Sequence, residues 1–546
     1  MKDKKRSFQI WLPTIFAFLF IGGIFVGTEL DNNAPFISTQ SGRANGGAVG
    51  IGNGKVEEIL RYVEARYVDD VEEDELMEDA INRVIQELDP HSNYIPAKQL
   101  KAINEQLEGN FDGIGVEFMT LEDTIVIVAP LAGGPSEAVG IMAGDKIIAV
   151  EDSIVAGVGK DTEEVISQLR GEKGSEVEVS ILRGNERRLR DFTIVRDEIP
   201  INSVDVAHML NENTGYIKIN RFSAKTYEEF MMGLERMIEK EGMENLVIDV
   251  RHNPGGYLQQ ATNILSQLFN DRGKLLVYTE GRTVKRTDYK TSGRNFFDIN
   301  NIAVLIDEGS ASASEIVAGA IQDLDRGVVI GRRSFGKGLV QEQYGLQDGS
   351  ALRLTVARYY TASGRSIQRD YEDLEAYDSD IIERFNRGEL SNIDSTQVAD
   401  SLKYYTRKGR IVYGGGGIIP DIFVPIDTTY LNEIYGKLSQ HIPVFIYRYL
   451  EQHPDEFEDV EVKDMELPDA LFNDFLQYVE SEGTNINTDD LVEVQALVKR
   501  SIAARIAKHY HGEEGFYSIW NQQDEAVQVA LESLKQKNPL KWQAQQ

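Results

Sequence analysis

A chain of 546 residues, 41% of them hydrophobic, is long enough to build several cores, and we expect three or more domains. Its formal net charge of −32 disfavours nucleic acid or an anionic membrane surface as a partner for most of the protein. Cysteine is absent, which excludes disulfides, thiolate zinc sites and cysteine nucleophiles but says little about the cellular compartment.

The N-terminus has the pattern of an export signal. The uncharged run Ile10–Val26 is about 17 residues long, at the lower limit for crossing a bilayer, and four basic residues precede it: Lys2, Lys4, Lys5 and Arg6. No A-x-A-like cleavage site follows the run, so we expect residues 1–30 to remain as a signal anchor. A cleaved signal peptide is the alternative. Both predict an extracytoplasmic body, on the periplasmic face of the inner membrane in a Gram-negative cell.

Residues 31–54 are rich in Gly, Ser and Asn and predict a flexible linker. Apolar residues then recur at helical spacing through a segment at 55–108, interrupted by the loop Leu88–Tyr94. His91 in this loop is expected to be structural. Residues 109–198 predict a small β-rich domain in which a glycine-punctuated turn at Asn110–Val116 precedes a strand and Thr162–Leu169 forms an amphipathic helix.

Strands and helices alternate in residues 199–428, which predicts an α/β core. An apolar strand at Leu246–Val250 runs into a loop that carries the glycine pair Gly255–Gly256. Glycines at such a loop let backbone approach a substrate without a Cβ in the way. A plain turn before the following helix is the alternative.

The most informative stretch is Asn301–Gln343. A buried strand at Ile302–Ile306 precedes the small-residue string Ser310–Ser314, a helix, a second strand at Val328–Ile330 and a glycine-flanked Lys337. This βαβ plan brings a hydroxyl and an amine to the carboxyl-end edge of one sheet, where sites in α/β sheets tend to lie.

A serine becomes a useful nucleophile when a neighbouring base takes its proton, and a lysine can be that base when burial lowers its pKa. Uncharged neighbours surround Lys337 in the sequence, as such a base requires. Helix capping by the serines is the alternative to catalysis. A Ser–His arrangement of His252 with Asp249 is a further alternative, although no G-x-S-x-G elbow is present.

Two C-terminal regions complete the chain. Residues 369–410 are polar and acidic and predict a partly helical insertion that covers the site, binds a partner, or does neither. Residues 429–546 have repeated helical spacing and predict a C-terminal helical domain. This domain and the segment at 55–108 are candidate surfaces for a homodimer.

Several motifs resemble the carboxyl-terminal processing proteases, a Ser–Lys peptidase family with a PDZ domain. They are LDPHSNY at 88–94, AGDKIIAVED at 143–152, DVRHNPGG at 249–256, GSASASEI at 309–316, SFGKGLVQ at 334–341 and YTASGRSIQ at 360–368. Ala362 stands where the family usually has proline. The resemblance implies a multidomain α+β / α/β fold, with a PDZ domain at 109–198 inserted before the protease core.

Carried over position by position, the resemblance makes Ser312 the nucleophile and Lys337, 25 residues later, the general base. Gln341, expected one helical turn past the lysine, would hold the amine. The oxyanion donors would be the N–H groups of Ala313 and Gly256, with Gly255 as the next candidate. A substrate carboxylate would bind at the PDZ loop formed by Gly113, Ile114, Gly115 and Val116; a PDZ domain that only packs on the protease is the alternative.

The expected function is therefore an extracytoplasmic serine endopeptidase that cleaves proteins with free, apolar C-termini at or near those ends. It would need no metal or organic cofactor and would contact the membrane through its anchor. A catalytically inactive PDZ scaffold is the first alternative. A nucleotide-binding protein is the second, because Gly331–Lys337 matches seven positions of a phosphate-binding loop. However, Gly338 stands where that loop needs a hydroxyl.

Overall fold

The computed structural model describes residues 54–546 except 185, 396–401, 487, 537–538 and 542–546. The expected anchor at 1–30 and nearly all of the linker lie outside these residues. Within the described part, we find no helix that combines the length and apolar character needed to cross a membrane. The chain divides into two compact units, Met1–Leu76 and Met77–Gln546.

The described part of the first unit consists of helix α2 (Lys55–Arg66) and the beginning of α3 (Glu73–Gln86). The apolar residues Val56, Ile59 and Tyr62 of α2 are exposed. The second unit continues with the short strand β1 (Asn93–Ile95) and helix α4 (Ala97–Glu108), which ends at Gly109 in the left-handed conformation.

Residues 110–200 form the expected small β-rich domain. Its main sheet has the order β3-β4-β5-β7-β8, with β6 paired to β5, and β2 and β9 pair where the chain enters and leaves. Alternate residues of β7 are buried, as expected for a sheet with one face on the core. The elements are β2 (Asn110–Gly113), β3 (Val116–Leu121), β4 (Thr124–Pro130), α5 (Pro135–Ala138), β5 (Lys146–Val150), β6 (Ser153–Ile154), α6 (Thr162–Leu169), β7 (Glu176–Leu182), β8 (Arg190–Val195) and β9 (Asp197–Pro200).

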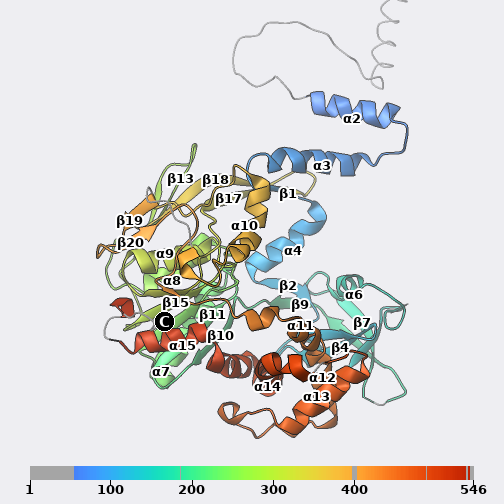
Figure 1. Cartoon of the computed structure of the whole chain (residues 1–546). Helices are drawn as coiled ribbons and strands as arrows, with labels where there is room; N and C mark the ends of the chain where they lie inside the picture. Colours follow the sequence, from blue (N-terminus) through green and yellow to red (C-terminus); the bar gives the residue numbers. More distant parts are fainter. Residues whose placement is uncertain (1–53, 185, 396–401, 487, 537–538, 542–546) are drawn as a thin grey trace, which may run out of the picture. The chain divides into compact units, whose positions relative to one another are not determined.

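The centre of the second unit is a six-stranded sheet with the order β10-β11-β12-β15-β16-β21 (Figure 1). Its strands are parallel except for the β10–β11 pair, and β12 and β15 are buried along their whole length, as in sheets covered on both faces. Helices α7, α8 and α9 pack on one face, and α15 packs on the other. The bounds are β10 (Val204–Met209), β11 (Thr214–Ile219), α7 (Thr226–Glu241), β12 (Asn245–Asp249), α8 (Leu258–Gln267), β15 (Ile302–Ile306), α9 (Ala313–Asp323), β16 (Val328–Gly331), β21 (Ile422–Phe423) and α15 (Glu525–Leu534).

A second sheet adjoins this centre. It has the order β1-β18-β13-β14, with β17 also paired to β18. The strands are β13 (Leu275–Glu280), β14 (Thr287–Lys290), β17 (Leu339–Gly345) and β18 (Ala351–Thr361). The expectation of a helical turn after the lysine is wrong, because Gln341 lies on strand β17. A shift in the β17–β18 register between Val340 and Gln341 accompanies this change.

The insertion at 369–410 is partly helical, as expected. It contains α10 (Leu374–Asn386) and the short helix η2 (Ile393–Ser395), and its last strand β19 (Lys403–Tyr405) pairs with β20 (Ile411–Tyr413). The chain then returns to the central sheet at β21.

Most of residues 429–546 build a helical domain with its own apolar core. Its elements are η4 (Thr428–Leu431), α11 (Glu433–Ser439), α12 (Ile442–Gln452), η5 (Val462–Asp464), α13 (Asp469–Ser481) and α14 (Thr488–Trp520), which is kinked at Gly512. The last helices, η6 (Asn521–Gln523), α15 and η7 (Pro539–Lys541), follow. Because α15 buries Val527 and Ala530 against the central sheet, it contributes to the core of the α/β domain.

Candidate active site

Two turns meet at the carboxyl-end edge of the central sheet, one between β15 and α9 and the other between β16 and β17. Ser312 lies in the first turn and Lys337 in the second. Together with Gln341 and Gly256, both side chains line one cleft of about 670 Å³. The βαβ plan predicted from the sequence therefore brings a hydroxyl and an amine to one cavity.

Ser312 has an unusual backbone conformation. Its φ is 55° and its ψ is −111°, a region that residues with a Cβ rarely adopt. Such strain persists where the surroundings over-determine it, and it is often found at functional sites. Ser312 is also the N-cap residue of α9. The same serine therefore occupies the capping position and lines the cleft.

Lys337 is half-buried in its turn. Its Nζ donates to Oε1 of Gln341 at 3.1 Å, and Nε2 of Gln341 donates to the carbonyl of His91 at 2.7 Å. Burial lowers the pKa of Lys337, and the nearby Arg353 lowers it further, against the opposing effects of Asp89 and Glu315. The lysine is thereby shifted toward the neutral amine that a base must be.

Glu315 and Tyr359 hold the two turns together through their backbones. The buried Glu315 carboxylate accepts the N–H groups of Ser312 and Lys337, both at 2.9 Å. The Tyr359 hydroxyl lies 3.1 Å from the carbonyl of Ser312 and 2.6 Å from that of Lys337, toward both of which it can donate. Burial raises the pKa of Glu315 to about 7, in spite of these hydrogen bonds and those from Ser334 and Gly336.

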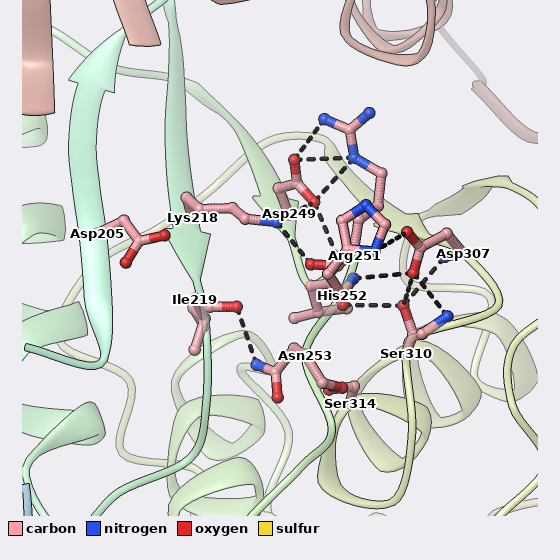
Figure 2. Close-up of polar contacts among 12 residues, drawn as sticks. Asp205, Lys218, Ile219, Asp249, Arg251, His252, Asn253, Asp307, Ser310 and Ser314 are labelled. Carbon is pink, nitrogen blue, oxygen red and sulfur yellow. Dashed lines mark hydrogen bonds and ion pairs between the residues drawn. The ribbon is translucent and has the colours of Figure 1, made fainter. Parts of the chain in front are cut away.

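The loop after β12 is attached to the serine turn (Figure 2). The Asn253 side chain donates to the carbonyl of Ile219 at 2.9 Å, and the Asn253 carbonyl accepts the N–H of Ala311 and Oγ of Ser314, each at 2.9 Å. A Cβ on Gly255, whose φ is 103°, would stand 2.7 Å from Cβ of Ser312. Only glycine allows this close approach of the loop to the nucleophile turn.

The two N–H groups predicted as oxyanion donors differ from the Gly255 N–H in whether they already donate a hydrogen bond. The Gly255 N–H donates to Oδ1 of Asn253 at 2.8 Å and is therefore occupied. Neither Gly256 N–H nor Ala313 N–H donates a hydrogen bond within the described part of the chain. Ala313 is the first residue of α9, so its N–H also lies at the positive end of the helix dipole.

His252 and Asp249 do not form the pair that a Ser–His mechanism needs. The His252 ring is 78% exposed, and its Nδ1 lies 3.0 Å from Oδ2 of Asp307. Asp249 instead contacts Lys218, Arg251 and the Tyr216 hydroxyl, as Figure 2 shows for the two cations. Burial alone would raise the pKa of Asp249, but Arg251 and then Lys218 outweigh it and hold this pKa below its usual range.

The rest of the cleft is partly apolar. Its lining includes Leu258, Ile316, Leu339 and Val340 from the α/β domain and the second sheet, and Ile103 and Leu107 from α4. Next to the nucleophile turn, this lining can accommodate an apolar side chain of a bound peptide.

The predicted peptide-binding residues lie at the start of the β-rich domain. Gly113 ends β2, Val116 begins β3, and Gly115 has a φ of 70° in the connection between them. The carbonyl of Ile114 is occupied by the N–H and hydroxyl of Ser136. In the described sheet β3 is an edge strand, paired only with β4, so it offers an edge to which an extended peptide can add.

Three contributors to this site were not predicted from the sequence: Glu315, Tyr359 and the carbonyl of His91. Glu315 could have been found, because a glutamate three residues after a serine N-cap is the signature of a capping box. Tyr359 carries no local signal. His91 lies in the LDPHSNY motif, but nothing local shows that its carbonyl contacts Gln341, which is distant in the sequence.

Comparisons with known proteins identify the family of each domain. The family model for peptidase family S41 matches residues 213–375, and that for the PDZ domain matches residues 113–194. A carboxy-terminal-processing protease of Bartonella bacilliformis is 35% identical over 64% of this chain and 79% of its own length. The carboxy-terminal processing protease CtpB of Bacillus subtilis is 35% identical over 58% of this chain and 65% of its own.

Among solved structures, the photosystem II D1 C-terminal processing protease is 30% identical, with a TM-score of 0.33, over 58% of this chain and 85% of that one. The sequence matches, together with the fold, define a serine-type peptidase of family S41 that carries a PDZ domain before its protease domain. The chain belongs to the carboxy-terminal processing proteases.

Proposed function

We propose that this C-terminal processing protease works through a catalytic dyad of Ser312 and Lys337. The observation that carries the proposal is that a strained serine and a half-buried, hydrogen-bonded lysine line the same cleft. Gln341 supports it further, because it places an acceptor on the lysine amine and is itself held by a backbone carbonyl.

In the proposed reaction, neutral Lys337 takes the proton of Ser312 Oγ as this oxygen attacks the scissile carbonyl carbon. The N–H groups of Ala313 and Gly256 donate hydrogen bonds to the resulting oxyanion. These hydrogen bonds become stronger in the transition state, because negative charge develops on the oxygen. The lysine ammonium then gives its proton to the leaving amine, the C–N bond breaks, and an acyl-enzyme ester remains. Water attacks the ester, Lys337 takes the water proton, and it returns a proton to Ser312 as the ester bond breaks.

The substrates we propose are proteins with free, apolar C-terminal residues. The apolar lining of the cleft supports a preference for apolar substrate side chains at the cut site. The open edge of β3 supports capture of a chain end by the PDZ domain, with the carboxylate at the Gly113–Val116 loop.

We also propose an extracytoplasmic location, with the N-terminus as a membrane anchor. The basic residues before the uncharged run Ile10–Val26 support this location. A homodimer through the exposed apolar face of α2 is a further part of the proposal, supported by Val56, Ile59 and Tyr62.

The test compares the full chain with its Ser312→Ala and Lys337→Ala variants on an unfolded protein substrate. We expect both variants to lose at least about 10³-fold in kcat while keeping their fold, because each removes a group that bonds to the reacting atoms or moves their proton. His252→Ala is the matched control and should cleave normally. Cleavage by Lys337→Ala together with loss in His252→Ala would show that the base is misassigned.

A further inference from the structure

The insertion at 369–410 packs directly against the turn that carries Lys337. Buried Arg384 of α10 donates from Nη1 to the carbonyl of Ser334 at 3.2 Å and from Nη2 to the carbonyl of Arg333 at 2.5 Å. Glu389 fixes this guanidinium through Nε at 3.1 Å and also accepts from Arg333 at 2.5 Å. Two carbonyls at the start of the lysine turn are thus satisfied by a side chain of the insertion.

A second set of contacts reaches the middle of the same turn. The Arg369 N–H donates to the carbonyl of Gly336 at 3.0 Å. Its guanidinium lies 4.1 Å from the ring centre of Phe335 and 3.7 Å from that of Tyr377, and Asp380 pairs with it at 2.5 Å. A guanidinium in contact with two aromatic rings is a stable arrangement.

From Tyr377 a short series of contacts leads to the lysine amine. The Tyr377 hydroxyl lies 2.7 Å from Nε2 of His91, and the His91 carbonyl accepts Nε2 of Gln341 at 2.7 Å. Oε1 of the same amide then accepts from Nζ of Lys337. Burial, together with the Lys337 charge, lowers the pKa of His91 to about 4. The ring is therefore neutral at neutral pH, and its Nε2 can accept a hydrogen bond from the Tyr377 hydroxyl.

We propose that the insertion is a positioning element for the general base, and that Tyr377 acts on Lys337 through His91 and Gln341. The proposal rests on the role given to Lys337 under Proposed function. From the sequence alone, residues 369–410 could cover the site, bind a partner or do neither. The proposal gives this segment a role. The insertion contacts the lysine turn outside the cleft, since none of its described residues (369–395 and 402–410) lines the cleft.

The test is a double-mutant cycle between Tyr377→Phe and Gln341→Ala in the full chain. Tyr377→Phe removes one hydroxyl and keeps the ring that stacks on Arg369. We expect kcat on an internally quenched peptide with an apolar C-terminus to fall roughly 3- to 10-fold, with KM unchanged, because one positioning hydrogen bond is lost. In the Gln341→Ala background the same change should have no further effect, since the contact through which it acts is gone.

The pH dependence of kcat/KM gives a readout that a general loss of stability would not move. Loss of the Gln341 acceptor destabilises the ammonium, so the pKa of Lys337 falls further and the rising limb moves to lower pH. Tyr377→Phe should move the rising limb of the profile to lower pH, in the same direction as Gln341→Ala. The control Tyr371→Phe lies in the same insertion, where its hydroxyl contacts Arg358 at 2.9 Å, and should leave both kcat and the limb unchanged.

Independent, multiplicative losses from Tyr377→Phe and Gln341→Ala would overturn the proposal, as would wild-type behaviour of Tyr377→Phe. Should Tyr377→Phe unfold, His91→Ala gives the same test, because it removes the ring and keeps the carbonyl. Activity in Lys337→Ala would instead overturn the proposed dyad, so failure of the dyad and failure of the insertion's role give different results.

Discussion

At the scale of single residues, the site depends on groups that hold the backbone of the nucleophile and the base. Tyr359 contacts the carbonyls of both Ser312 and Lys337, and Glu315 accepts the N–H groups of both. One acceptor and one donor thus hold the N–H and the carbonyl of the same two residues. Neither side chain needs to touch the substrate to have this effect.

Tyr359→Phe tests the carbonyl side. We expect kcat to fall about 10-fold and the free energy of unfolding to fall by about 1–2 kcal/mol, because two buried carbonyls lose a donor. Steady-state kinetics and urea unfolding measure the two effects. Tyr360→Phe is the matched control, since the neighbouring Tyr360 stacks on Tyr278, away from both turns. Equal behaviour of the two variants would contradict the role of Tyr359.

Glu315→Gln tests the N–H side and its pH dependence. Burial raises the pKa of Glu315 to about 7, above its ordinary value of 4.5. The associated stability is therefore fully present below about pH 4.5 and is lost as pH rises through about 7. Between pH 5 and pH 8, we expect the wild type to lose about 2–3 kcal/mol more unfolding free energy than Glu315→Gln, measured in urea. The variant should also be less active at pH 8, because its amide cannot accept all four hydrogen bonds. Parallel stability curves for the two proteins would refute the assignment.

At the scale of elements, the last helix is linked to the loop of Gly255 and Gly256. Asp524 is the N-cap of α15 and accepts Nη1 of Arg251 at 2.9 Å and 3.1 Å. The same guanidinium binds Asp249 at the end of β12, and Lys218 donates to the Arg251 carbonyl at 2.6 Å. The conformation of this loop therefore depends on a helix whose N-cap residue lies 273 residues after Arg251 in the chain.

Asp524→Ser tests this link, because serine keeps the helix cap but is too short to bridge to the guanidinium. We expect a loss of about 2 kcal/mol in unfolding free energy and about a 5-fold lower kcat with little change in KM. Asp469→Ser is the control, since Asp469 is an exposed aspartate at the start of α13 that pairs with Lys499. An Asp524→Ser variant with wild-type kinetics would mean that Asp249 alone fixes Arg251.

At the scale of the whole molecule, the recognition and the cleavage proposed above belong to separate domains. The β3 edge belongs to the PDZ domain, and the cleft belongs to the α/β domain together with α4 and the second sheet. A substrate can therefore be held by its chain end in one place and cut in another.

Peptide binding to the Ser312→Ala protein tests this division without cleavage. A peptide with an apolar C-terminus and a free carboxylate should bind at least about 10-fold more tightly than the same peptide with a C-terminal amide, because backbone N–H groups favour the charged acceptor. Fluorescence anisotropy measures both affinities. Equal affinities would mean that the Gly113–Val116 loop does not recognise a carboxylate.

Much of the secondary structure of the PDZ domain and the α/β core followed from local patterns. The strand at Ile302–Ile306 and the helix at Thr162–Leu169 occupy the predicted residues, because apolar runs and helical spacing are properties of a few neighbouring residues. Gln341 is the instructive failure. Its spacing from Lys337 fits a helical turn, but pairing with β18 makes the segment a strand, and such pairing depends on residues outside any local window.

The family, the βαβ order and the placement of Ser312 and Lys337 at one edge of the sheet could be inferred from the sequence alone, because a parallel sheet brings consecutive carboxyl ends to one edge. Which side chains hold these two residues depends on tertiary packing. Tyr359, His91, Tyr377 and Asp524 reach the site from four different segments, and no periodicity marks such partners. Their contacts arise from packing, which joins residues according to their positions in space and not in the chain.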